Sequence, residues 1–200
     1  MEKNATTSVP IHDLLRDRWS PRAFSDDPVA PAQITALLEA ARWAASSMNA
    51  QPWSFVVADR TQDPESHAAM VSVLREGNQV WAQHAPVLIL TLAQPTFVRN
   101  DRPNTHAWHD LGAATAQLVM QATSMGLHAH GMAGLLPDAA RSTFSVPDAL
   151  DIVAIWAVGH RAAPESLPEA LETRERMERT RKPLAEIAHR GAFGTPWTSA

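Results

Sequence analysis

The sequence predicts one α+β domain, arranged as a three-layer sandwich around a mixed sheet of four or five strands. Of its 200 residues, 45% are hydrophobic and 19% are charged, which suits a single domain with a substantial core. Apolar runs of strand length alternate with segments whose apolar residues recur at helical spacing. Residues 1–9 are polar and the chain turns charged after residue 160, so we expect a flexible N-terminus (1–9) and a C-terminal arm (160–200).

Helical periodicity is clearest over residues 31–45, where the apolar positions follow i, i+3, i+4, i+7 spacing: Ile34, Leu37, Leu38 and Ala41. A short helix over residues 10–19 precedes it. Asp63-Pro64 is typical of a helix start, since a capping side chain is followed by a first-turn proline, and Gly77-Asn78 is expected to end that helix. The remaining predicted helices are a long one over 105–125, ended by Gly126, and short ones that start at Pro137 and Pro183.

Strands are predicted over residues 53–58, 85–93, 127–136 and 151–159. Residues 85–93 are almost continuously apolar, which favours a central strand covered on both faces. Residues 94–105 are polar and contain two prolines, so a loop or mobile insert is expected there.

Composition excludes several classes of site. There is no cysteine, which rules out disulfides, zinc–thiolate sites and thiol nucleophiles. The formal charge is -4 without a basic stripe, so we expect no nucleic-acid partner. No apolar run reaches the roughly 18 residues of a membrane span, and residues 1–10 lack the apolar segment of a signal peptide, so a cytoplasmic location is expected. No glycine-flanked serine, phosphate-cradling glycine loop or dinucleotide fingerprint is present.

Two histidine pairs and one charged run invite a functional interpretation. His106 and His109, beside Asp110, have a spacing that could ligate a metal, but no third ligand is evident and a solvated helix start is favoured. His128 and His130 would share one face of a strand, which favours structural or pocket-lining roles. Residues 169–181 alternate arginine and glutamate, a pattern more typical of a solvated helix than of a site.

Two groups of cations suit a phosphate. Arg18, Ser20 and Arg22 lie at a predicted helix end, while Arg179, Arg181 and Lys182 precede Pro183. Guanidinium forks match phosphate oxygens and a serine hydroxyl adds a neutral donor, although each arginine alone could be a surface charge. A second feature is the uncharged loop 44–53, whose hydroxyls and carboxamides suit a flat polar ligand. The alternative for this loop is a helix C-cap followed by a turn.

Three motifs together resemble the flavin-dependent nitroreductase family: Arg18-Trp19-Ser20-Pro21-Arg22-Ala23-Phe24, Ser46-Ser47-Met48-Asn49-Ala50-Gln51-Pro52-Trp53 and Arg181-Lys182-Pro183-Leu184. The resemblance extends over residues 12–187, and residues 126–134 are similar to the family's stretch beside the flavin ring. It implies an intertwined homodimer that binds two FMN molecules at the subunit interface. Three residues depart from those common in relatives: Trp19, Ala45 and Ala133, the last at the predicted edge of the flavin ring.

The resemblance also implies roles for individual residues. Arg18 and Ser20, with Trp19 between them, would contact the phosphate and ribityl end, and Arg179 and Arg181 would close on the phosphate. Arg22 would lie near the pyrimidine edge, where a cation favours reduced flavin. The partner subunit would contribute Ser46, Ser47 and Asn49, and the backbone of Met132, Ala133 and Gly134 would pass the ring.

The function that the resemblance implies is ping-pong transfer of a hydride from NADPH or NADH, through FMN, to a nitroaromatic, quinone or activated alkene. The flavin supplies the chemistry, so no catalytic side chain and no metal are expected. Alternatives are a flavin-binding store or sensor without turnover and a dedicated reductase or oxidase of one metabolite. Trp108 and loop 94–105 are candidates to roof the acceptor space, with core packing as the alternative for Trp108.

Overall fold

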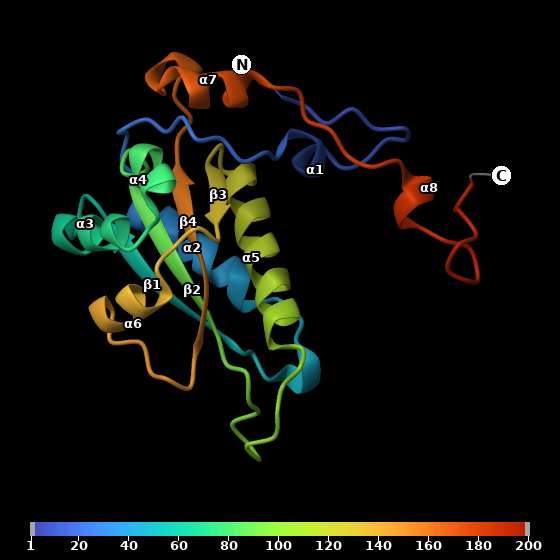
Figure 1. Ribbon diagram of the computed structural model, residues 1–200, viewed down its shortest axis with the longest axis horizontal. Coiled ribbons are helices and arrows are strands. Elements are labelled where there is room, and N and C mark those ends of the chain that lie inside the picture. Colours follow the sequence, from blue (N-terminus) through green and yellow to red (C-terminus); the bar gives the residue numbers. More distant parts are fainter. Residues whose placement is uncertain (1–2, 199–200) are drawn as a thin grey trace.

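A four-stranded sheet forms the centre of the computed structural model, which describes residues 3–198 (Figure 1). Its strands, in spatial order, are β1 (Trp53–Asp59), β2 (Val87–Ala93), β4 (Asp151–Gly159) and β3 (His128–Met132). All four strands were predicted. The central strand β2 is buried at every position, as its continuous apolar sequence requires.

The expectation of a mixed sheet is wrong for the described residues, because each pair of neighbouring strands is antiparallel. Helix α5 (Ala107–Ser124) connects β2 to β3, and these two strands run in the same direction because both are antiparallel to β4. Such a helical crossover usually predicts parallel neighbours. Here β4 is inserted between the two strands, so the parallel pair never shares a ladder.

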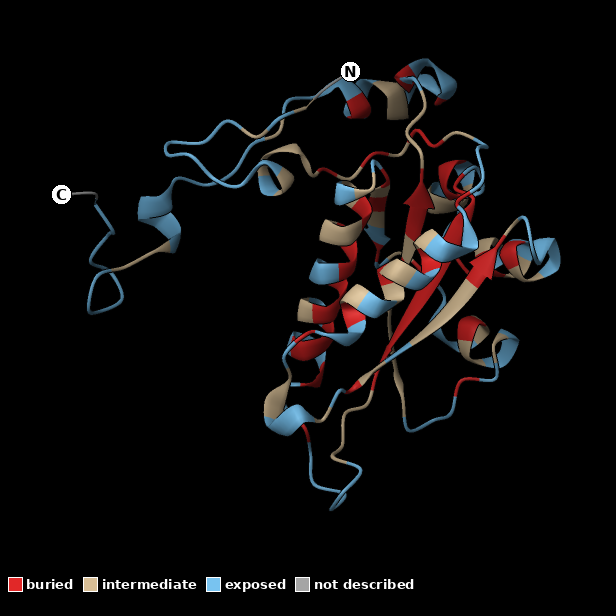
Figure 2. Cartoon of the chain, turned by 180° about the vertical axis from the view of Figure 1, so that it is seen from behind, coloured by how far each residue is buried: buried red, intermediate tan, exposed pale blue. Residues whose placement is uncertain are grey.

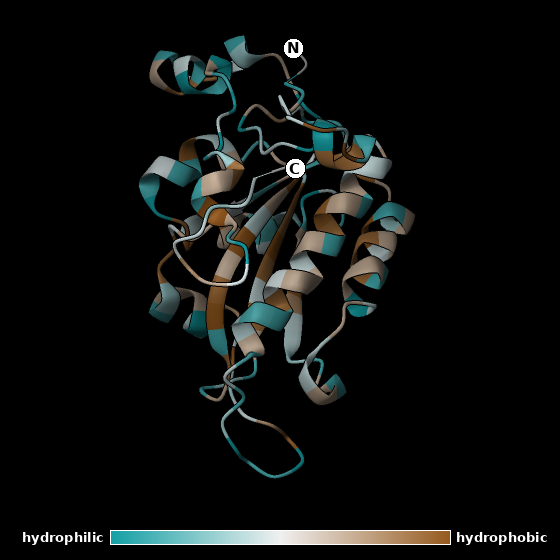
Figure 3. Ribbon diagram, turned by 90° about the vertical axis from the view of Figure 1, so that its right-hand side faces the viewer, coloured by the Kyte–Doolittle hydropathy of each residue, from teal (hydrophilic) through white to brown (hydrophobic). Residues whose placement is uncertain are grey.

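Helices cover both faces of the sheet, which confirms the three-layer sandwich (Figure 1). One face packs against α2 (Pro31–Arg42) and α5, and the other against α3 (Pro64–Ser72), α4 (Glu76–Ala82) and α6 (Pro137–Thr143). Successive residues of β2 alternate between these layers: Leu88 and Leu90 face α3 and α4, whereas Val87 and Ile89 face α2 and α5. Figure 3 shows the hydrophobic colours concentrated on the strands and the inner helix faces.

Most helix ends follow the predicted signals. Asp63 caps α3 by accepting a hydrogen bond from the Ser66 amide at 2.9 Å, and Gly126 ends α5 with a φ of 72°. The prediction that Gly77-Asn78 ends α3 is wrong, since both residues lie inside α4. The chain leaves α3 earlier because the fully buried Leu74 forms a β-bridge with Leu135.

The N-terminal segment and residues 175–183 lie side by side along one edge of the sandwich, and the chain then extends away from it (Figure 1). Residues 3–12 lead into α1 (Asp13–Asp17), and the C-terminal segment contains η2 (Pro164–Ser166), α7 (Glu169–Arg176) and α8 (Leu184–Ile187). The Lys3 ammonium donates to the Glu175 carbonyl at 2.6 Å, and the Ala5 amide donates to the Arg16 carbonyl at 2.9 Å. Beyond these contacts both segments are largely exposed (Figure 2). Among residues 3–198, no helix combines the length and apolarity needed to cross a membrane.

Candidate functional site

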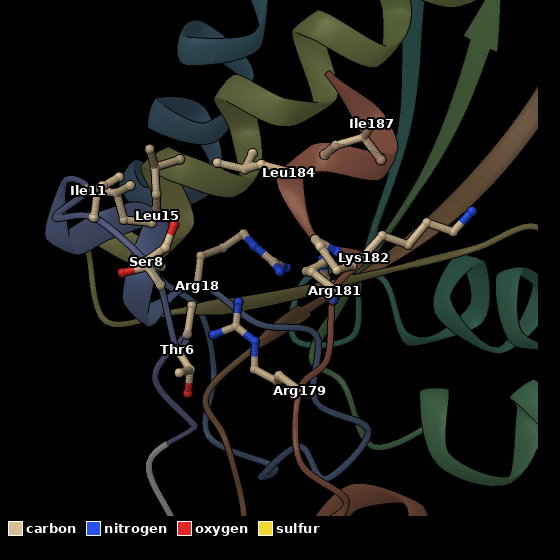
Figure 4. Close-up of a pocket in the computed structure, with 14 residues that line it drawn as sticks. Thr6, Ser8, Ile11, Leu15, Arg18, Arg179, Arg181, Lys182, Leu184 and Ile187 are labelled. Atoms are coloured by element: carbon tan, nitrogen blue, oxygen red, sulfur yellow. The ribbon is translucent and has the colours of Figure 1, made fainter. Parts of the chain in front are cut away.

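Three arginines from the two ends of the chain meet in one cavity of about 880 Å³. Arg18 is the C-cap of α1, and Arg179 and Arg181 follow α7. Figure 4 shows that Arg18 and Arg179 direct their guanidinium groups into the same space, whereas Lys182 points away. The Arg18 guanidinium also donates to the Ser20 hydroxyl at 3.1 Å. The predicted convergence of the two cationic segments is therefore present within one chain.

The electrostatics of this cluster fit a bound anion. The pKa of Arg18 is lowered from its ordinary value, first by burial and then by the positive charges of Arg179 and Arg181. Burial and the charge of Arg181 likewise lower the pKa of Arg179. Within residues 3–198, no carboxylate forms an ion pair with any of the three. Arg179 donates to two backbone carbonyls and Arg181 is exposed, so part of this charge is compensated within the chain. A dianionic phosphate such as that of FMN would compensate the rest.

The remaining walls of the cavity are mostly apolar and come from both arms. Its lining includes Ile11, which precedes α1, Leu15 of α1, and Leu184 and Ile187 of α8 (Figure 4). All four side chains are at least 40% exposed, which is unusual for residues of this size. The cavity thus joins a cationic end to an open apolar surface.

Residues 18–22 also border a smaller hollow of about 220 Å³, with Arg179 and Arg181 on its other side. Trp19 is only 7% exposed and packs edge-on against His128, with the Lys3 ammonium 4.9 Å from the centre of the indole ring. Its contact with a cofactor stays a prediction. Arg22 also lines this hollow, and its backbone amide donates to the Glu175 carboxylate.

Strand β3 lies within residues 126–134, the predicted flavin-ring stretch, and contacts the turn at residues 18–22. The Nδ1–H of His130 donates to the Pro21 carbonyl at 2.9 Å. Burial is the main cause that lowers the pKa of His130 to about 4 and that of His128 to about 4, so both rings are neutral near pH 7. These contacts agree with a structural role for the pair. Residues 3–198 contain no group of three His, Asp or Glu side chains able to hold a metal.

Gly134, at the end of this stretch, lies close to Asn78 and Arg75. Its carbonyl accepts hydrogen bonds from the Asn78 amide side chain and from the Arg75 backbone, both at 3.0 Å. A Cβ at position 134 would lie 2.7 Å from Asn78 Nδ2, so only glycine fits without a rearrangement. Met132 is buried, whereas Ala133 is exposed. The sequence did not identify Arg75 and Asn78 as the residues that donate to the Gly134 carbonyl. The available sequence signal is Gly134 itself, since a glycine can mark a position where another group comes close.

The uncharged loop lies at the opposite end of α5. The Ser47 amide donates to Asp110 Oδ2 at 2.9 Å in the first turn of that helix, whereas Trp19 packs on His128 beyond its last turn. An 18-residue helix is about 27 Å long, so one chain does not bring Ser46, Ser47 and Asn49 to the arginines. Met48 and Asn49 both have a φ of 53°, a strained conformation that is most common at functional sites.

The family model for the nitroreductase family matches residues 15–160. The chain belongs to the nitroreductase family. A solved structure described as an oxidoreductase containing FMN is 36% identical, with a TM-score of 0.91 and 98% coverage of each chain. An uncharacterised 15.4 kDa protein of Mycolicibacterium smegmatis is 36% identical over 66% of this chain and 87% of its own length. A putative NADH dehydrogenase/NAD(P)H nitroreductase of Streptomyces coelicolor is 24% identical over 76% of this chain and 83% of its own length.

In this nitroreductase-family chain, five of the predicted site residues line the smaller hollow together: Arg18, Ser20, Arg22, Arg179 and Arg181. Their contacts with FMN stay a prediction. Two further residues were not recognised from sequence as parts of this arrangement. Asp110 is buried and holds the loop through Ser47, although it was considered only beside a possible metal pair. Glu175 is 2% exposed, so the prediction of a solvated helix over residues 169–181 is wrong at this position.

Trp108 lies near the N-terminus of α5 with 55% of its surface exposed, so the alternative that it packs in the core is wrong. Its indole N–H donates to Asp151 Oδ2 at 2.7 Å, which fixes the orientation of the ring. The neighbouring loop 94–105 is closed by a β-bridge between Thr96 and Pro103. A role for either in covering an acceptor stays a prediction.

Proposed function

We propose that this protein is an FMN-dependent oxidoreductase that uses NADPH or NADH to reduce a small organic acceptor. Membership of the nitroreductase family supports the coarser part, a flavin-dependent oxidoreductase. The observation that carries the assignment of FMN is the convergence of Arg18, Arg179 and Arg181 on one cavity without a carboxylate partner among the described residues. The similarity to the Streptomyces coelicolor protein named putative NADH dehydrogenase/NAD(P)H nitroreductase supports the choice of donor.

The phosphate would be held by the three guanidinium groups and the Ser20 hydroxyl, with the ring placed along Met132, Ala133 and Gly134. When bound, FMN supplies the redox chemistry by accepting a hydride and passing the electrons on. The protein has to bind and orient it. The cationic side chain of Arg22 would favour the reduced flavin, which is more negative than the oxidised form.

A homodimer completes the proposed site. Since Ser46, Ser47 and Asn49 lie about one α5 length from the arginines, they can reach the same cofactor only from a second copy of the chain. The arm also carries several apolar side chains that are more exposed than an isolated chain favours. These are Met177, Leu184, Ile187, Phe193 and Trp197.

Donor and acceptor would occupy the same space in turn, which is the structural basis of a ping-pong cycle. Nitroaromatics, quinones and activated alkenes are the acceptor classes proposed. Trp108 offers a large, fixed aromatic surface on which a flat acceptor could stack.

Absorbance spectroscopy tests the function. The purified protein, supplied with FMN, should show flavin absorbance that bleaches when NADPH or NADH is added without oxygen. A nitroaromatic or a quinone should then restore the colour, and sedimentation should give the mass of a dimer. Bleaching without recovery would exclude these acceptors, and flavin that no nicotinamide bleaches would support a binding protein without turnover. Failure to take up FMN would overturn the proposal.

A further inference from the structure

Glu175, in the last turn of α7, is the one fully buried glutamate among the described residues. Its two carboxylate oxygens accept hydrogen bonds from the Arg22 amide at 2.9 and 3.1 Å, and Oε1 also accepts from the Ala23 amide at 3.3 Å. Burying a carboxylate is costly unless its oxygens are satisfied. The structure satisfies this one with backbone groups that lie more than 150 residues earlier in the chain.

The contacts of Glu175 are part of a larger connection between the two ends of the chain. Its carbonyl accepts from the Lys3 ammonium at 2.6 Å. Four residues later, the Arg179 guanidinium donates to the Lys3 carbonyl at 2.6 Å and to the Arg16 carbonyl at 2.9 Å. Residues 175–179 are therefore fastened to the N-terminal segment on both sides of Arg18.

This arrangement determines where the arginines lie. Arg18 and Ser20 lie between the two fastening points at Arg16 and Arg22, while Arg181 follows Arg179 directly. Without the Glu175 contacts, the turn at residues 18–23 and the segment at 179–181 would each gain freedom. The guanidinium groups would then have to be ordered when the anion binds, at the expense of affinity.

We propose that Glu175 is a positioning residue for the phosphate site: its carboxylate fixes the turn that presents Arg18 and Ser20 and ties Arg179 and Arg181 to it. This inference rests on the proposed FMN function. The carboxylate need not touch the phosphate, because its oxygens are already occupied by backbone amides. Its effect is therefore expected to depend on the phosphate of the ligand rather than on the flavin ring.

The test compares FMN with riboflavin, which has the same ring and no phosphate, by fluorescence titration. In Glu175→Gln the side chain keeps its size, but one oxygen is replaced by an NH₂ group that faces backbone donors. FMN affinity should fall by about tenfold to a hundredfold, while riboflavin affinity stays within about twofold. The matched control is Glu172→Gln on the same helix, where the carboxylate contacts only the exposed Arg176 among the described residues; it should change neither affinity.

Two results would overturn the inference: equal losses for FMN and riboflavin, or unchanged FMN binding in Glu175→Gln. Wild-type protein that does not prefer FMN over riboflavin would instead overturn the proposed phosphate site itself, and the inference with it. If Glu175→Gln does not fold, as judged by circular dichroism, Glu175→Asp takes its place, since it keeps the charge but shortens the reach. In an Arg179→Ala background, the substitution at 175 should cost less FMN affinity than in the wild type, and an equal cost would count against the coupling.

Discussion

Replacing Arg18 by alanine should affect the empty and the FMN-bound protein in opposite ways. In the structure this guanidinium is half-buried beside two like charges, and its described hydrogen bond is to a neutral hydroxyl, that of Ser20. With FMN bound, the same group would face a dianionic phosphate. Arg18→Ala should therefore weaken FMN binding while leaving the empty fold intact.

The expected magnitudes follow from the contacts. A hydrogen bond between charged partners contributes about 1.5–3 kcal/mol, which corresponds to a loss of roughly tenfold to 150-fold in affinity. In the empty protein, the lost bond to Ser20 is offset by relief of the repulsion from Arg179 and Arg181. The free energy of unfolding should consequently change by less than about 0.5 kcal/mol.

Urea unfolding of the FMN-free protein and FMN titration at two salt concentrations measure the two effects. The affinity difference between wild type and variant should shrink at high salt, because screening weakens the phosphate contact. Arg42→Ala is the control, since Arg42 is an exposed arginine of α2 whose guanidinium Nε bonds Glu39 at 2.8 Å. A variant at position 18 that loses more than about 2 kcal/mol of stability but binds FMN normally would refute the reasoning and make Arg18 a structural residue.

Three further substitutions test other parts of the site. Gly134→Ala should displace the Asn78 amide, which would lie 2.7 Å from the new Cβ, and lower the free energy of unfolding by about 1–3 kcal/mol in a urea titration. Asp110→Ala removes the acceptor of the Ser47 amide and should cost about 1–3 kcal/mol, with faster hydrogen exchange at that amide. His130→Phe should reduce the loss of stability measured between pH 7 and pH 4, because the pKa of His130 in the folded protein is about 4; part of the slope should remain, since the pKa of His128 is also about 4.

The direction of the pH effect follows from proton uptake. The folded-state pKa of His130 lies below its ordinary value of 6.5, so as the pH falls below 6.5 the unfolded chain binds a proton that the folded protein does not. Stability is therefore lost between pH 6.5 and 4, by roughly 3 kcal/mol for this residue. His84→Gln, at an exposed position, should keep the wild-type slope. A parallel profile in His130→Phe would contradict the assignment.

Controls for Gly134→Ala and Asp110→Ala separate the loss of one contact from a general loss of stability. An Asn78→Ala/Gly134→Ala double variant should be less destabilised than the sum of the single changes, because the collision and the hydrogen bond involve the same pair. His109→Ala leaves the Asp110–Ser47 contact in place and should not alter exchange at the Ser47 amide. Additive losses of stability in the double variant would show that Gly134→Ala does not act through Asn78. Faster exchange at the Ser47 amide in His109→Ala would show that the Asp110–Ser47 hydrogen bond does not control that exchange.

Local signals were sufficient for most of the fold. Nine consecutive apolar or small residues predicted the central strand, and Asp63-Pro64 and Gly126 predicted helix ends, because each feature depends on neighbours in the chain. The direction of the strands was not predictable in this way. It depends on β4 entering between β2 and β3, a choice made by packing of the whole sheet.

The site was predictable only in part, and for the same reason. Arginines 18 and 181 could be paired only through the family motifs, since 163 positions separate them and no local rule relates them. The buried Glu175 was hidden in an alternating charged run, because its partners are backbone amides near residue 22. The left-handed turn at Met48-Asn49 was equally hidden, since non-glycine residues rarely adopt it.

In the proposed homodimer, the neutral loop of one chain and the arginines of the other would form each FMN site, so a defect in one of the two parts could be complemented by a second chain. A chain bearing Arg18→Ala and a chain bearing Asn49→Ala would each bind FMN weakly on their own, because both sites of each homodimer would carry a substitution. In a heterodimer of the two variants, one FMN site would contain both substitutions and the other would contain neither. If equal amounts of the two variants assemble at random, about half of the dimers are heterodimers, each with one unsubstituted site. About a quarter of all sites should therefore bind FMN with wild-type affinity.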